Sequence, residues 1–139
     1  MKILSVVGAR PQFIKEAIVG EELRKCGIEE TLVNTGQHYD ANMSDIFIKD
    51  LNIKKPDYNL SVGSGSHGYQ TGTTIIKLEK VVNDEKPDLI MVYGDTNATL
   101  AGALVGAKLK IPIAHVEAGI RQNPKDMPNL LFAPGQGKQ

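Results

Sequence analysis

Two carboxylates and a cation lie shortly after the ends of apolar segments in this sequence. Arg10 follows the first such segment, and Asp95 and Glu117 follow the last two. Carboxylates held close together can have their pKa values split, so that one serves as a base while the other stays an acid. Such a pair, with a cation beside it, suits abstraction of a proton from a weakly acidic carbon and return of a proton elsewhere.

Arg10 lies in the loop Gly8–Gln12, ahead of a predicted helix, and Lys15 lies near the start of that helix. A helix N-terminus favours an anion, and the guanidinium fork of arginine suits phosphate. The loop lacks the three glycines of a dinucleotide fingerprint and the lysine and hydroxyl of a P-loop. Taken alone, Arg10 is equally compatible with a solvated loop arginine.

The other polar residues also have structural interpretations. Asp95 or Thr96 could be the N-cap of the next helix, and His115 could be a hydrogen-bonded core residue. His38 could bind phosphate or act as an acid, or it could cap a helix. With His67, the three histidines show no short ligand spacing, so no metal site is predicted. No nucleophile-elbow pattern follows any predicted strand, which argues against a serine hydrolase.

Five apolar, β-branched runs alternate with helical patterns, which is typical of a doubly wound, Rossmann-like parallel α/β sheet. The predicted strands are Lys2–Val7, Glu30–Asn34, Tyr58–Ser61, Leu89–Tyr93 and Ile113–Val116. The predicted helices are Pro11–Cys26, Asn42–Leu51, a segment from after Ser66 to Asp84, and Asn97–Lys108. For an open parallel sheet with right-handed crossovers, we expect the strand order 3-2-1-4-5. Arg10, Asp95 and Glu117 would then meet at the switch point, where open α/β sheets bind ligands.

Composition narrows the function further. The 139 residues fit one domain, and 16 basic residues balance 16 acidic ones, so neither nucleic acid nor an anionic membrane is a predicted partner. The single cysteine and the short apolar run at the N-terminus indicate a cytoplasmic protein. Cys26 is expected to pack among apolar neighbours, and the helix Asn97–Lys108, nearly all Ala, Leu, Val and Gly, to be heavily buried. Residues 1–121 are the expected domain, and 122–139 an irregular tail that is truncated or altered.

Four segments together, in order and spacing, resemble the N-terminal domain of the UDP-N-acetylglucosamine 2-epimerases. They are Gly8–Gln12 with Lys15, Thr35–His38, Val92–Thr96 and His115–Arg121. The resemblance implies the N-terminal half of a glycosyltransferase-B-like architecture, a C-terminal partner domain, a homodimer of the full-length enzyme and a role in cell-surface polysaccharide biosynthesis. The family interconverts UDP-N-acetylglucosamine and UDP-N-acetylmannosamine without a separate cofactor. It eliminates UDP to leave 2-acetamidoglucal, then adds UDP back after C2 is reprotonated from the opposite face.

The matching motifs imply roles for five residues. Arg10, Lys15 and His38 would bind substrate, with Arg10 and Lys15 stabilising the departing diphosphate. Asp95 and Glu117 would transfer protons or orient the sugar.

Three departures from the family pattern limit these roles. Met127–Leu130 lacks the further catalytic carboxylate of the family's Met-Pro-Glu-Glu segment, and the C-terminal domain is missing. Asp40 replaces the second glutamine of effector-regulated bacterial members. We therefore expect these 139 residues not to epimerise the substrate unaided. The alternatives are an epimerase that hydrolyses the UDP-sugar, an epimerase of a UDP-diacetamido uronic acid, and a non-enzymatic domain that only pairs with another chain.

Overall fold

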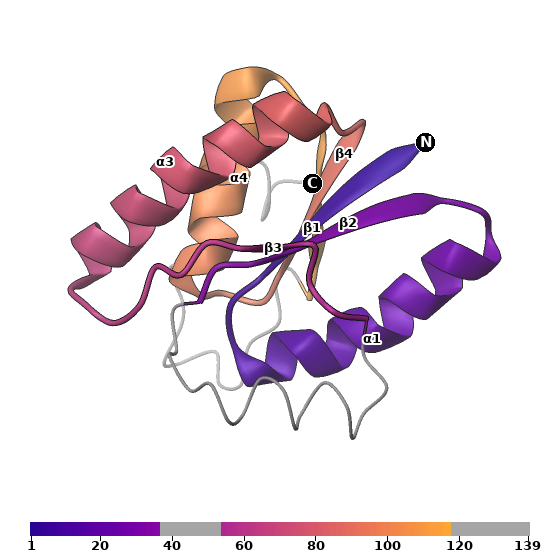
Figure 1. Ribbon diagram of the computed structural model, residues 1–139, viewed down its shortest axis with the longest axis horizontal. Coiled ribbons are helices and arrows are strands. Elements are labelled where there is room, and N and C mark those ends of the chain that lie inside the picture. Colours follow the sequence, from indigo (N-terminus) through magenta and orange to yellow (C-terminus); the bar gives the residue numbers. More distant parts are fainter. Residues whose placement is uncertain (37–53, 118–139) are drawn as a thin grey trace, which may run out of the picture.

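The computed structural model describes residues 1–36 and 54–117, which form a five-stranded parallel sheet with helices on both faces (Figure 1). The strands are β1 (Lys2–Val7), β2 (Glu29–Asn34), β3 (Tyr58–Asn59), β4 (Leu89–Tyr93) and β5 (Ile113–Val116). Their order in the sheet is β3-β2-β1-β4-β5, so the predicted order is confirmed. The strands β1 and β4 are hydrogen-bonded neighbours, and the switch point therefore lies between their carboxyl ends.

Helix α1 (Arg10–Lys25) covers one face of the sheet, and α3 (His67–Glu85) and α4 (Asn97–Leu109) cover the other (Figure 1). The alternation of side chains along β1 separates two apolar cores. Leu4 and Val6 pack with residues of α3 and α4, whereas Val7 packs with Phe13 of α1. Burial on both faces explains why the central strands are continuous apolar runs in the sequence.

The helix boundaries agree with the predicted ones to within one or two residues. The Ser66 hydroxyl accepts a hydrogen bond from the Tyr69 N–H at 3.1 Å and so caps α3. Gly27, with φ of +75°, follows α1 in the left-handed conformation that commonly ends a helix. The predicted helix Asn42–Leu51, His38 and the expected boundary near residue 121 lie outside the described residues.

Three expectations differ from the structure. The third strand is shorter than Tyr58–Ser61 because Ser61 adopts φ of +53°, which is incompatible with an extended strand. Helix α4 is buried on one side only, and Leu100 and Leu104, one turn apart on its other side, are exposed. Cys26 is exposed because it is the C-cap of α1, beyond the last turn that packs on the sheet.

No helix within the described ranges is both long enough and apolar enough to cross a membrane.

Candidate active site

Lys15 and Glu117 form an ion pair at the carboxyl edge of the sheet. Lys15 Nζ donates a hydrogen bond to Glu117 Oε1, although 102 positions separate the two residues in the chain. They meet because β1, β4 and β5 are consecutive in the sheet. Their side chains are 43% and 28% exposed, so the pair contributes at most about 1 kcal/mol to stability. A ligand can therefore reach both charges and compete for them at small cost.

Glu117 has an unusual backbone conformation for its residue type. Its φ is +69°, in the left-handed region that disfavours residues with a Cβ atom by roughly 1–2 kcal/mol. Residues held in this region cluster at functional sites. The conformation occurs directly after β5 ends, at the residue whose carboxylate meets Lys15.

Asp95 lies in the tight turn between β4 and α4. The preceding Gly94 has φ of +71°, and the N-cap of α4 is Thr96, so the capping role considered for Asp95 belongs to its neighbour. Asp95 is exposed, and within residues 1–36 and 54–117 no hydrogen bond or ion pair engages its carboxylate. The carboxylate is thus available to a ligand at the edge that also holds the Lys15–Glu117 pair.

His115 has the structural role that the sequence allowed. Its Nε2 lies 2.6 Å from the carbonyl oxygen of Gly94. Because a carbonyl can only accept, Nε2 carries the proton and donates it. The Gly94 N–H in turn donates to the Val116 carbonyl at 3.2 Å, so the end of β5 supports the Asp95 turn through two hydrogen bonds.

Arg10 is the first residue of α1 and is exposed. The first turn of α1 contains no acidic residue, so no carboxylate of that turn offsets the positive end of the helix dipole. His38 cannot be placed relative to it, because that histidine is outside the described residues. In the described part of the chain, no group of three or more His, Cys, Asp or Glu residues could hold a metal ion.

Glu16, the neighbour of Lys15, points the other way and is fully buried beneath α1. Burial first, and then the neighbouring carboxyl group of Glu30, raise the pKa of Glu16 to about 9. The Ser5 hydroxyl donates to Glu30 at 2.8 Å. Gly20 leaves room for the two carboxyl groups, because a Cβ there would lie 2.6 Å from Glu16 Oε1. Glu16 is therefore protonated at neutral pH and belongs to the core rather than to the edge.

Tyr93, the last residue of β4, is buried on the same face as Glu16. Burial, and secondarily the negative charge that Glu16 and Glu30 carry at high pH, raise the pKa of Tyr93 above its usual range. Its hydroxyl therefore stays protonated and donates to Met91 Sδ at 3.3 Å.

A family model described as UDP-N-acetylglucosamine 2-epimerase matches residues 21–130 of the chain. The chain belongs to this family. A UDP-N-acetylglucosamine 2-epimerase homolog of Methanococcus maripaludis is 53% identical over 96% of this chain and 41% of its own length. The UDP-2,3-diacetamido-2,3-dideoxy-D-glucuronate 2-epimerase of Pseudomonas aeruginosa is 52% identical over 94% of this chain and 37% of its own length.

Among solved structures, the Methanocaldococcus jannaschii UDP-GlcNAc 2-epimerase in complex with UDP-GlcNAc and UDP superposes with a TM-score of 0.84. The two sequences are 50% identical, and the match covers 92% of this chain and 35% of that one. The chain thus spans 35% to 41% of the length of these epimerases. It has the fold of the N-terminal part of the family's glycosyltransferase-B-like architecture, as the sequence motifs predicted.

Of the five residues assigned to the epimerase site, the structure joins Lys15 directly to Glu117. It places Arg10 at the start of α1 and Asp95 in the turn between β4 and α4. Gln12, for which the sequence predicted no role, bonds both to the loop before α1 and to this turn. A sequence signal for it exists, since a glutamine at the third position of a helix often bonds back to the backbone before the helix. That signal predicts a local cap and not a contact with β4.

Proposed function

We propose that this chain provides the N-terminal, substrate-binding half of an enzyme that interconverts UDP-N-acetylglucosamine and UDP-N-acetylmannosamine. The single observation that supports this most is the Lys15–Glu117 ion pair, which lies beside the Asp95 turn in a chain of the epimerase family. It puts a cation and two carboxylates at the edge where open α/β sheets bind ligands.

In this proposal the cations act on the diphosphate and the carboxylates act on the sugar. Lys15 and Arg10 bind the phosphate oxygens and stabilise the charge that develops as UDP departs. Of Asp95 and Glu117, one takes the C2 proton and the other orients the sugar or returns a proton from the opposite face. The C1–O bond of the sugar breaks with its electron pair leaving on UDP, and UDP re-adds to 2-acetamidoglucal after C2 is reprotonated.

A second candidate substrate is a UDP-diacetamido uronic acid. The P. aeruginosa epimerase named for such a sugar is 52% identical to this chain, nearly as similar as the M. maripaludis homolog. The chemistry at C2 would be the same, so the carboxylates and cations would keep their roles. The two substrates differ in the groups at C3 and C5, which residues outside this edge would have to recognise.

The experiment that tests the proposal has a binding arm and a turnover arm. UDP-N-acetylglucosamine is titrated into the 139-residue chain while backbone amide NMR shifts are recorded. We expect shifts at Arg10, Lys15, Asp95 and Glu117. Shifts confined to other elements would contradict the proposal.

For turnover, the chain and a full-length epimerase that contains it are each incubated with either nucleotide sugar, and products are resolved by NMR. We expect no epimerisation by the chain alone, because it spans only 41% of the length of the M. maripaludis homolog and less of the P. aeruginosa epimerase. The full-length enzyme is expected to yield the 2-epimer of one nucleotide sugar with UDP still attached. Sustained turnover by the chain alone would overturn the first expectation, and free sugar with UDP would indicate a hydrolysing epimerase.

A further inference from the structure

We propose that Gln12 is the positioning residue that holds the Asp95 turn in place against the loop and helix that carry Arg10 and Lys15. This inference rests on the proposed function, because it explains how the two halves of that site keep their relative position. Gln12 occupies the third position of α1 and is only 5% exposed, although its side chain is polar.

The carboxamide of Gln12 uses its full hydrogen-bonding capacity. Its Oε1 accepts from the Gly8 N–H at 2.8 Å and from the Ala9 N–H at 3.3 Å. Its Nε2 donates to the Tyr93 carbonyl at 2.7 Å and to the Thr96 hydroxyl at 3.0 Å. An amide has two acceptor positions and two donor hydrogens, so none is left over. The orientation of the amide is also determined, because backbone N–H groups only donate and a carbonyl only accepts.

These four bonds join two different loops. Gly8 and Ala9 connect β1 to α1, whereas Tyr93 and Thr96 flank Gly94 and Asp95 in the turn between β4 and α4. A purely local helix cap would need only the two bonds to Oε1. The two bonds from Nε2 cross 81 and 84 positions of sequence, and they bracket the residue assigned to the sugar.

Gly94 fits closely against this bridge. A Cβ at Gly94 would lie 3.3 Å from Gln12 Nε2, so a larger residue there would press on the amide. His115 and Val116 hold the other side of the turn through Gly94. The Asp95 turn is thus fixed by β5 on one side and by Gln12 on the other. Within the described residues, Gln12 is the only side chain that bonds both to this turn and to the loop before α1, the helix that carries Lys15.

Two substitutions of Gln12 test whether its hydrogen bonds position the Asp95 turn or only stabilise the fold. Gln12→Met has a similar length but makes none of the four bonds. In Gln12→Glu, burial beside the Tyr93 carbonyl favours the protonated carboxyl group. One of its oxygens keeps the acceptor for Gly8 and Ala9, and its hydroxyl can donate to the Tyr93 carbonyl and accept from the Thr96 hydroxyl. Thr74→Val is the matched control, because Thr74 is buried and the change removes its hydrogen bond of 2.6 Å to the Gln70 carbonyl within α3, away from both loops.

We expect Gln12→Met to weaken binding of UDP-N-acetylglucosamine to the chain by about tenfold or more, since small misplacements of binding groups are costly. Gln12→Glu should restore affinity to within a few-fold of the unaltered chain, and Thr74→Val should leave affinity unchanged while lowering stability in urea. Equal affinity of Gln12→Met and Gln12→Glu would overturn the positioning role.

An amide hydrogen-exchange measurement separates this inference from the proposed function. If the unaltered chain binds no UDP-N-acetylglucosamine, the proposed function fails. The positioning role of Gln12 is then tested by the hydrogen-exchange rates of the Gly94 and Gly8 amides alone. Faster exchange at both in Gln12→Met, but not in Thr74→Val, would support the bridge. Unchanged exchange at Gly94 in Gln12→Met would contradict it.

Discussion

Lys15 holds Glu117 by an ion pair that spans the β1–β4–β5 side of the sheet, with the cation on a helix and the carboxylate on a left-handed residue after β5. The two side chains are 43% and 28% exposed, so the contribution of the pair to the free energy of unfolding is small. The same exposure gives a phosphate access to the lysine. Replacing Lys15 should therefore change ligand affinity more than it changes the free energy of unfolding.

Lys15→Met is expected to weaken binding of UDP-N-acetylglucosamine by about tenfold or more, because a hydrogen bond to a charged group contributes about 1.5–3 kcal/mol. The free energy of unfolding in urea should change by no more than about 1 kcal/mol. Lys25→Met is the matched control, since Lys25 lies on the same helix and pairs with Glu21 and Glu22 away from the edge. Equal loss of affinity in both variants would show that general charge, and not the position of Lys15, attracts the ligand.

Asp95→Asn and Glu117→Gln, placed in a full-length epimerase that contains this chain, are each expected to lower kcat by at least about a hundredfold. The neutral amides keep the size of the side chains but can neither take nor give up a proton in the reaction. Glu79→Gln, on the exposed side of α3, serves as the control and should leave kcat unchanged. If the kcat values of Asp95→Asn and Glu117→Gln both lie within tenfold of that of the unaltered enzyme, the assignment of the carboxylates is wrong.

The buried carboxyl group of Glu16 makes stability depend on pH. Its pKa is raised from an ordinary 4.5 to about 9, so the folded chain holds a proton that the unfolded chain releases above pH 4.5. The contribution of Glu16 to the free energy of unfolding is therefore largest below pH 4.5, and it falls as the pH rises toward 9. The slope is at most about 1.4 kcal/mol per pH unit.

Urea unfolding between pH 5 and pH 9 tests this dependence, and Glu16→Gln should flatten it because the amide does not titrate. Glu79→Gln, which removes an exposed carboxylate, should keep the slope of the unaltered chain. A slope that is the same with and without Glu16 would mean that other groups cause the pH dependence.

Lys110→Gly is expected to stabilise the chain by about 0.5–1 kcal/mol. Lys110 ends α4 with φ of +60°, a conformation that glycine adopts without the Cβ penalty. Lys80→Gly is the opposite control, because Lys80 lies in the interior of α3 and glycine there should destabilise by about 1 kcal/mol. Both are measured by urea unfolding, and a loss of stability in Lys110→Gly would contradict the expectation.

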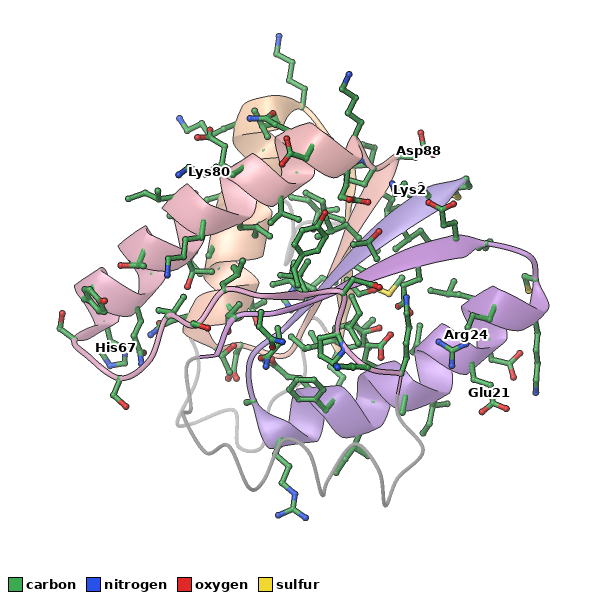
Figure 2. The ribbon with its side chains drawn as sticks, viewed as in Figure 1. Lys2, Glu21, Arg24, His67, Lys80 and Asp88 are labelled. Carbon is green, nitrogen blue, oxygen red and sulfur yellow. The ribbon has the colours of Figure 1, made fainter. Side chains whose placement is uncertain are left out.

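Figure 2 shows residues at the two opposite ends of the sheet. Lys2 and Asp88 lie at the amino-terminal ends of β1 and β4, where the Lys2 N–H donates to Asp88 Oδ2 at 2.8 Å. His67 lies at the opposite end, at the start of α3, where Asn97 Nδ2 is 3.1 Å from its Nδ1. The first helical turns of α3 and α4 are thus joined at the end that also holds the Asp95 turn.

The sequence by itself determined the strands, their order and the edge at which Arg10, Asp95 and Glu117 emerge. Apolar runs of strand length separated by helical patterns leave few topologies, and right-handed crossovers reduce these to a handful, among which 3-2-1-4-5 is the order expected of a Rossmann-like sheet. Backbone signals of this kind are local, as at Gly27 after α1 and Ser66 before α3. For that reason they could be predicted without knowing what lies across the sheet.

Only the tertiary structure decided which side chains meet. The partners Lys15 and Glu117 are 102 positions apart, and Gln12 and Tyr93 are 81 apart, so no local pattern contains either contact. Glu16 is an ordinary charged helix residue in the sequence, yet it is buried against Glu30 because α1 turns that face to the sheet. Such contacts depend on the direction in which each side chain leaves its element, which is fixed only when the helices pack on the sheet.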